Sequence, residues 1–367
     1  MKTFISISRF IIGTLFIFSG LIKANDPLGL SYKMQEFFEV WNLHSFNDYT
    51  LTLSVIMISF EIIAGVAVLI GWKMRIFSWL LLALILFFTF LTAYALFSGK
   101  IRECGCFGDC IPLQAYQSFI KDVVLLMLIL ALMPFRNSIQ PVTRKSTAKI
   151  ILFFTIVFSF AFQWYVLEHL PVVDCLPYKV GNNIPEKMKI PAGAIPDSTV
   201  ILFTYKKDGK QSSFTTENFP ADFDDSYKFV RREDKIVRKG TAVPAIRDFS
   251  LQTTSGTDTT QALLTEPGTK LFLFLKDGYK PGDWIQEMDI IMNEASKKNI
   301  KGFLVTNLDV PENHEGFLTQ LIVLKTDGTA IKTAARYNPT LFLVKDGTIV
   351  KKWSAVDFDQ ALRYIVK

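Results

Sequence analysis

The strongest constraint on the fold is segment 76–98, which is mostly apolar, carries no charge and is long enough to cross a lipid bilayer. Four further segments have a similar length and character: 4–22, 51–71, 116–135 and 150–167. Hydrophobic residues make up 50% of the chain, which is a high share for a soluble protein of this size. We therefore expect five transmembrane helices, with the lipid bilayer as a partner of the chain.

The basic residues predict the orientation of these helices, because cytoplasmic loops are enriched in Lys and Arg. Three basic groups share one side if the N-terminus is cytoplasmic: Lys2 with Arg9, Lys73 with Arg75, and Arg136 with Arg144, Lys145 and Lys149. The loop 99–115 and everything after His169 then lie outside. In a bacterium this predicts a multi-pass protein of the inner (cytoplasmic) membrane with a periplasmic C-terminal part, where disulfides persist.

A few charged side chains interrupt the apolar segments. Glu61 lies in the middle of its segment, where a charge is costly and usually faces the interior of a helix bundle. It either pairs with Arg9 or Lys23 to lock helix packing, or it takes part in the chemistry of the protein. Lys121 and Asp122 stand near the start of their segment, and we expect them to reach the membrane interface.

The composition changes to that of a globular domain after the fifth apolar segment. We divide the chain into a four-helix membrane domain (1–135), a cytoplasmic loop with the fifth helix (136–170), a small β-rich connector (171–240) and an α/β domain (241–367). Within the connector, segments 199–205 and 211–216 flank a Lys-Asp-Gly turn and predict a hairpin. The last unit begins with a predicted strand at 248–252 and has the thioredoxin-like order of strand, helix, strand, helix, strand, hairpin and helix.

The thioredoxin-like unit departs from the redox-active pattern at one decisive place. Active thioredoxins carry a Cys-x-x-Cys pair after the central strand, but segment 276–284 contains no cysteine. The unit therefore cannot run dithiol chemistry by itself. Asn338-Pro339 precedes the final hairpin, where this fold usually places a cis-proline, and Pro339 is a candidate residue for docking a client protein.

The four cysteines of the chain are its most informative residues. Cys104, Cys106 and Cys110 crowd into one loop, and Cys175 follows the fifth apolar segment at the same membrane surface. A disulfide between Cys104 and Cys106 would close a small, strained ring, and strained disulfides are readily reduced. Four cysteines permit three pairings, and the sequence does not choose among them.

The membrane part resembles the methylamine-utilisation MauE and DoxX-like family over roughly residues 5–135. The resemblance rests on segments 9–13 and 19–23, on Glu61 with Ala64-Gly65, and on the string Cys104-Gly105-Cys106-Phe107-Gly108. It implies membrane-linked redox or disulfide chemistry. The four-helix layout is also similar to that of DsbB and vitamin K epoxide reductase, which couple thiols to a quinone.

The resulting hypothesis is a membrane-bound thiol–disulfide redox protein. Cys104 and Cys106 would form the pair next to the membrane, and Cys110 or Cys175 would exchange with a periplasmic client. A quinone is the possible cofactor, with Glu61 and Arg9 as candidate residues near it. The thioredoxin-like unit would hold the client.

Two other function classes remain open from the sequence alone. In the first, the disulfides are structural and the protein is a non-enzymatic, membrane-anchored assembly or docking factor. Alternatively, Cys104, Cys106 and Cys110 could carry zinc or copper(I), although the chain has only three histidines and none in a ligand-like cluster. No Lys/Arg block of the kind that binds nucleic acids is present.

Overall fold

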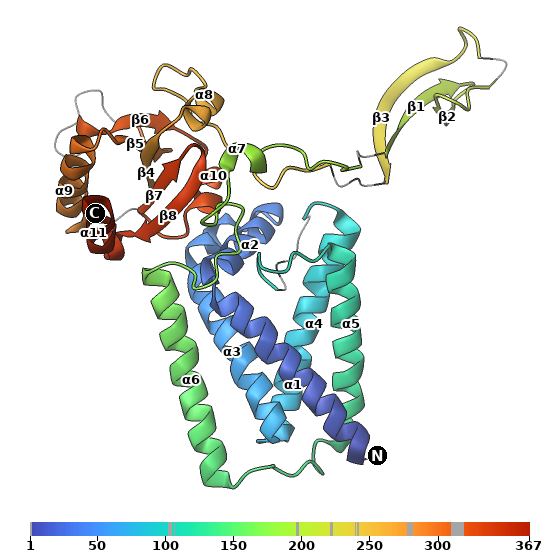
Figure 1. The fold of residues 1–367 in the computed structure, drawn as a ribbon. Helices are drawn as coiled ribbons and strands as arrows, with labels where there is room; N and C mark the ends of the chain where they lie inside the picture. The colour runs from blue at the N-terminus through green and yellow to red at the C-terminus, as the bar shows by residue number, and fades with distance from the viewer. Residues whose placement is uncertain are drawn as a thin grey trace.

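The computed structural model describes residues 2–101, 105, 107–195, 198–220, 223–238, 240, 242–276, 282–309 and 319–367. Cys104 and Cys106 lie outside the described residues. Within this part, five helices are long and apolar enough to cross a membrane: α1 (Lys2–Ala24), α3 (Thr50–Ile70), α4 (Met74–Ser98), α5 (Ala115–Leu132) and α6 (Lys145–Glu168). They match the five predicted segments and stand side by side below the soluble domain (Figure 1).

The loop after α1 contains a helix that the apolar pattern did not predict. Helix α2 (Pro27–Val40) begins where Asp26 accepts a hydrogen bond from the backbone N–H of Gly29, with Pro27 in its first turn. An acidic N-cap followed by proline is a normal helix start. A short 3₁₀ helix, His44–Tyr49, leads from α2 into α3. Helix α2 lies at the end of the bundle that faces the soluble domain (Figure 1).

Helices α1 and α3 approach each other closely through two glycines. A Cβ atom on Gly65 would lie 2.8 Å from the carbonyl oxygen of Gly13, and one on Gly13 would lie 2.9 Å from the carbonyl oxygen of Gly65. Small residues at such crossings let the two backbones pack directly. The buried side chains of Ile12 and Phe16 extend this contact into the core of the bundle.

We expect Gly65→Val to destabilise the membrane domain, because the added side chain would strike the backbone of α1 at the crossing. Overpacking of this kind costs roughly 1–3 kcal/mol. The free energy of unfolding of the purified protein in mixed micelles, titrated with SDS, measures the effect. Leu86→Val on the exposed side of α4 is the control, and an equal loss in both variants would contradict the prediction.

The predicted hairpin in the connector is part of a small antiparallel sheet. Strand β1 (Ser198–Lys207) pairs with β2 (Lys210–Thr215) across the Lys-Asp-Gly turn, and on its other side with β3 (Lys228–Arg238). Tyr205 is the centre of an aromatic cluster with Phe214, Phe219, Phe223 and Phe229. The sheet projects away from both the bundle and the C-terminal domain (Figure 1).

The C-terminal domain has a thioredoxin-like fold. Its described strands are β4 (Thr269–Leu275), β5 (Lys301–Thr306), β6 (Ile322–Lys325), β7 (Thr340–Lys345) and β8 (Thr348–Ser354), in the spatial order β6-β5-β4-β7-β8. Strand β4 runs parallel to β5 and antiparallel to β7. The Asn338–Pro339 peptide bond before β7 is cis, at the position that the sequence predicts. This topology confirms the thioredoxin-like prediction.

Helices cover both faces of this sheet. Helices α9 (Trp284–Lys297) and α11 (Phe358–Val366) bury their apolar sides against one face. Helix α10 (Gly328–Ala334) lies on the other face, with the short helices α7 (Ile184–Lys187) and α8 (Thr260–Thr265).

Three details of this domain differ from the sequence prediction. Tyr178 and Ile184, which fall in the predicted connector, are buried in the core of the thioredoxin-like domain. The backbone near Ile184 also bonds to the turn before β8, so this part of the connector packs with the domain. The strand expected at 248–252 is reduced to isolated bridges at Gln252, and β6 and α10 were not predicted.

Candidate functional site

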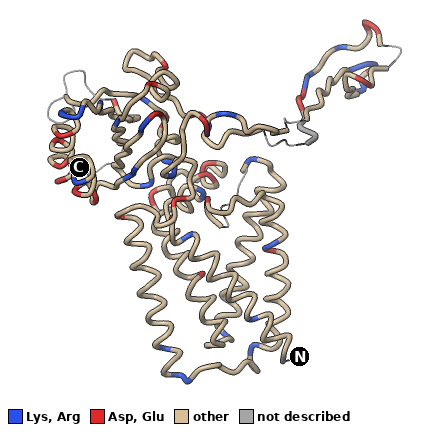
Figure 2. Tube along the Cα trace, viewed as in Figure 1, with Lys and Arg blue, Asp and Glu red and all other residues tan. Residues whose placement is uncertain are grey.

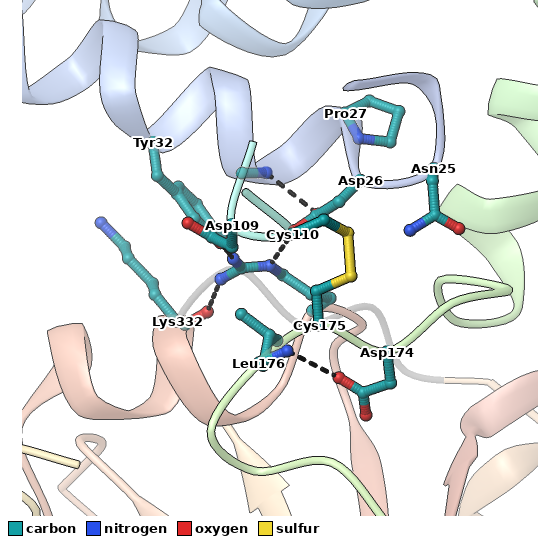
Figure 3. Close-up of polar contacts among 12 residues, drawn as sticks. Asn25, Asp26, Pro27, Tyr32, Asp109, Cys110, Asp174, Cys175, Leu176 and Lys332 are labelled. Atoms are coloured by element: carbon teal, nitrogen blue, oxygen red, sulfur yellow. Dashed lines mark hydrogen bonds and ion pairs between the residues drawn. A yellow bond between two sulfur atoms is a disulfide. The ribbon is translucent and has the colours of Figure 1, made fainter. Parts of the chain in front are cut away.

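A disulfide between Cys110 and Cys175 lies where the membrane and soluble domains meet (Figure 3). Cys110 belongs to the loop between α4 and α5, and Cys175 follows α6. The two cysteines are 65 positions apart in the sequence, with 4.8 Å between their Cα atoms. This is one of the pairings that the sequence left open. It joins two of the predicted site residues, while Cys104 and Cys106 are not described.

Each cysteine of this disulfide follows an aspartate that is bound to a cation of the thioredoxin-like domain. Asp109 accepts a hydrogen bond from Arg336, which precedes the cis-proline. Asp174 accepts a hydrogen bond of 2.8 Å from the ammonium group of Lys352 on β8. Burial lowers the pKa of Lys352, and the neighbouring Asp174 carboxylate opposes this effect. The disulfide is therefore held between two ion pairs that connect the domains.

Arg336 is the centre of the junction. Its Nε donates a 2.8 Å hydrogen bond to Asp26, the residue that caps α2, and its Nη1 donates one of 2.6 Å to the carbonyl oxygen of Lys332. Burial by itself lowers the pKa of the guanidinium, but Asp26 and Asp109 outweigh it, so the pKa is raised. Burial raises the pKa of Asp26 against the opposing effect of Arg336. A buried cation with two carboxylates is a strong, directional contact.

Tyr32 on α2 gathers the cations of the thioredoxin-like domain. The centre of its ring lies 5.4 Å from the Lys276 ammonium, 5.5 Å from that of Lys332 and 5.5 Å from the Arg336 guanidinium. Lys276 also donates a 3.1 Å hydrogen bond to the Tyr32 hydroxyl. A cation near an aromatic ring is attracted to the electron-rich face of the ring, and the attraction is strongest where water is excluded. Tyr32 was not among the predicted site residues, because its role depends on helix α2, which was not predicted either.

Lys276 and the cis-proline loop are bonded to each other. The backbone N–H of Lys276 donates to the side-chain oxygen of Asn338 at 3.0 Å, and the Asn338 amide donates back to the Lys276 carbonyl at 3.2 Å. Lys276 directly follows β4, where the Cys-x-x-Cys pair of an active thioredoxin would begin. Pro339 is buried at the start of β7, and its role in docking a client stays a prediction.

The structure separates the two residues that we expected near a quinone. Glu61 accepts a hydrogen bond of 2.6 Å from Lys23 and one of 3.2 Å from Ser19, and both charged side chains are almost fully buried. Arg9 instead donates to the carbonyl oxygens of Val68 and Leu69, which end α3 on the other side of the membrane domain. A cation bound to the last carbonyls of a helix stabilises that helix. Of the alternatives for Glu61, the structure shows pairing with Lys23.

A second buried carboxylate lies nearby on α5. Asp122 is fully buried, with the ammonium group of Lys121 at 2.7 Å and a 3.1 Å hydrogen bond from the Thr92 hydroxyl. Asp122 therefore faces the interior of the bundle, with Lys121 and Thr92 as its partners, and its depth in the membrane stays a prediction. Asp122 and Glu61 line the same small cavity of about 20 Å³, which also borders Phe107 of the cysteine loop. A space of this size is sufficient for one water molecule.

A larger cavity of about 190 Å³ lies beside it, between α2, α3 and α4. Its walls are mostly aromatic and aliphatic, including Phe37, Trp41, Phe87, Phe88 and Leu91. Lys23 and Phe88 border both cavities, with the Lys23 ammonium 4.6 Å from the centre of the Phe88 ring. Gly105, from the loop that carries the cysteines, also lines the larger cavity.

The described residues contain no group of three or more His, Cys, Asp or Glu side chains placed to hold a metal ion. The metal-carrier alternative needs Cys104 and Cys106, which are not described, so it stays a prediction. Cys110, its third expected ligand, is bonded to Cys175 instead. The donor set of the described part of the chain therefore gives this alternative no support.

Comparison with known proteins adds to this picture. No curated protein shows significant sequence similarity to the chain. One solved structure, titled "Identification of a disulfide switch in BsSco, a member of the Sco family of cytochrome c oxidase assembly proteins", is 13% identical with a TM-score of 0.25, over 33% of this chain and 90% of that chain. Residues 199–239 match a domain of unknown function, DUF8463. Residues 1–135 match the family model of Methylamine utilisation protein MauE, which confirms the resemblance of the membrane domain to that family.

Proposed function

We propose that the protein is a membrane-bound thiol–disulfide oxidoreductase that transfers electrons from a client dithiol to a quinone. One observation carries the proposal. Gly105, which stands between Cys104 and Cys106 in the sequence, lines the apolar cavity of the membrane domain, and Cys110 of the same loop forms the disulfide with Cys175. One loop thus connects a ligand-sized cavity to a disulfide at the outer end of the bundle.

The cavity fits the ring of a quinone. An apolar cavity of roughly 150 Å³ can hold a benzene ring, and this one measures about 190 Å³. Phe88 and Trp41 offer ring faces for stacking, and the Lys23 ammonium is a donor for a quinone carbonyl oxygen. A bound quinone would supply the capacity to take up two electrons and two protons. In this arrangement Lys23 would orient the ring, and Glu61 would hold or release a proton through Lys23.

The electron balance uses two cysteine pairs. A client dithiol reduces the Cys110–Cys175 disulfide to two thiols, and the client becomes a disulfide. A disulfide between Cys104 and Cys106 then oxidises these two thiols by exchange and becomes a dithiol. Its two electrons and two protons pass to the quinone, which restores the starting state of the chain.

The orientation of the helices across the membrane in this proposal is inferred from the positions of the basic residues. In Figure 2, Lys and Arg gather at the ends of the helices opposite the soluble domain. The positive-inside rule makes that side cytoplasmic. The cysteine loop, the Cys110–Cys175 disulfide and the thioredoxin-like domain then face the periplasm of a bacterial inner membrane, where a client with thiols would reach them.

The test is the thiol state of all four cysteines in the full-length protein in lipid nanodiscs. The protein is reduced with dithiothreitol, freed of reductant, and exposed to a short-chain ubiquinone without oxygen. We expect differential alkylation and mass spectrometry to show both pairs returning to disulfides much faster than without quinone. Cysteines that stay reduced in the presence of quinone would refute the proposal.

The second candidate function is a membrane-anchored docking factor with a purely structural disulfide. The ion pairs of Asp109 and Asp174 favour it, since they fix the disulfide between two domains. In that case Cys110–Cys175 resists mild reduction in the native protein, and quinone has no effect on any of the four thiols. The same alkylation experiment therefore separates the two functions.

A further inference from the structure

The thioredoxin-like domain has one face at which its fold brings two chain segments together. Lys276 directly follows the central strand there, Asn338 and Pro339 form the cis-proline loop, and Arg336 lies just before this loop. Asn338 bonds to both backbone groups of Lys276, so the segments form one surface. The sequence of residues 241–367 contains no cysteine, and the surface therefore has no thiol of its own.

That surface is covered by the membrane part of the same chain. Lys276 donates to the Tyr32 hydroxyl, and Arg336 donates to both Asp26 and Asp109. Figure 3 shows Tyr32, Asp26 and Asp109 close to the Cys110–Cys175 disulfide. Arg336 is only 8% exposed, although its partners come from a helix and a loop of the other domain. Asp26 and Asp109 are partly buried, and a buried cation is costly to leave without its acidic partners. The contact is thus built for a docked state of the two domains.

We infer that this face of the thioredoxin-like domain is the docking site for the chain's own Cys110–Cys175 disulfide, with Arg336 as its positioning residue. Arg336 holds Asp109, and Cys110 is the next residue along the chain. On the other side of the disulfide, Lys352 of the same domain holds Asp174, which directly precedes Cys175. The thioredoxin-like domain thereby holds both of the segments that carry the cysteines, and so holds the disulfide of its own chain in place.

The inference deepens the proposed function and rests on it for the claim that this disulfide exchanges. It assigns the thioredoxin-like domain an intramolecular occupant where the sequence predicted a client. Docking and disulfide formation then favour each other, because each holds the same two segments together. Thermodynamic linkage requires the effect to be reciprocal, so that reducing Cys110–Cys175 loosens the docked face.

The test compares Arg336→Gln with the wild type in nanodiscs, without any quinone. The equilibrium of Cys110–Cys175 with dithiothreitol is read by alkylation: the reagent's two thiols become a cyclic disulfide, and the protein disulfide becomes two thiols. We expect the glutamine variant to be reduced more readily by about tenfold or more, because a buried ion-pair network is lost. Arg336→Lys, which keeps the charge but not the forked geometry, should lie between the two.

Two further measurements keep the result interpretable if Arg336→Gln disturbs folding. Arg363→Gln removes an exposed Arg–Asp pair of the same domain and should leave the equilibrium unchanged. Hydrogen exchange of α2 should speed up both in Arg336→Gln and in the reduced wild type. An unchanged equilibrium in Arg336→Gln, or unchanged exchange of α2 on reduction, would overturn the inference. Failure of the proposed function would appear elsewhere, as thiols that quinone does not oxidise.

Discussion

Replacing Cys104 and Cys106 together by serine should abolish quinone-driven oxidation of the Cys110 and Cys175 thiols. A serine hydroxyl cannot form a disulfide and does not ionise near neutral pH, so the link from the cavity to the Cys110–Cys175 disulfide is lost. Loss of an essential nucleophile typically reduces a rate by far more than a thousandfold, and we expect at least about a thousandfold here. The rate of thiol oxidation by a short-chain ubiquinone is measured without oxygen. The reaction is stopped at set times, and alkylation determines the remaining thiols.

The matched control is the complementary double variant, Cys110→Ser with Cys175→Ser. It keeps the pair next to the cavity, and quinone should still oxidise Cys104 and Cys106 in it at nearly the wild-type rate. If the first variant keeps the wild-type rate of Cys110 and Cys175 oxidation, the loop pair does not carry electrons. If quinone oxidises no thiol in the second variant, oxidation depends on the outer disulfide, and the order of the two pairs is reversed.

The membrane architecture could be predicted from sequence because the bilayer imposes one simple requirement. A segment of about 20 apolar residues has few alternatives to a spanning helix, and all five predicted spans are helices. Helix α2 has no such signal, since its apolar residues are interrupted by Lys33, Gln35, Glu36 and Glu39. Its start is nevertheless encoded in Asp26-Pro27, an N-cap followed by proline, which is a signal independent of apolar length.

The candidate site could be predicted only in part, because its residues are joined by tertiary contacts. The cysteines were recognisable as a motif, but the pairing of Cys110 with Cys175 depends on how α6 returns to the cysteine loop. Arg336 and Asp26 are 310 positions apart in sequence, and no local pattern relates them. The burial of Asp122 likewise depends on a tertiary contact, because its partner Thr92 lies on α4, a different helix.

Breaking the buried ion pair of Lys23 and Glu61 should distinguish its contribution to protein stability from its contribution to quinone-driven thiol oxidation. Lys23→Met leaves the Glu61 carboxylate buried without its ammonium partner, and loss of one partner of a buried pair costs about 3–5 kcal/mol. The double variant Lys23→Met with Glu61→Gln removes both charges and should recover most of this loss. SDS titration of the purified protein in mixed micelles gives the free energy of unfolding. The exposed pair of Lys297 and Glu294 is the control, where the corresponding change should stay below about 1 kcal/mol.

Quinone-driven thiol oxidation in the same double variant decides what the pair is for. If Lys23 orients the quinone ring and Glu61 transfers a proton, the stability returns but the oxidation rate stays low. The reason is that methionine and glutamine supply neither the ammonium group nor the carboxylate. If the pair only locks α1 to α3, stability and oxidation rate recover together. The second outcome would contradict the role proposed for Lys23 and Glu61, while leaving the cysteine relay to be tested by its own variants. Lys23 borders both cavities, so the combination of restored stability and lost oxidation is the result that we expect.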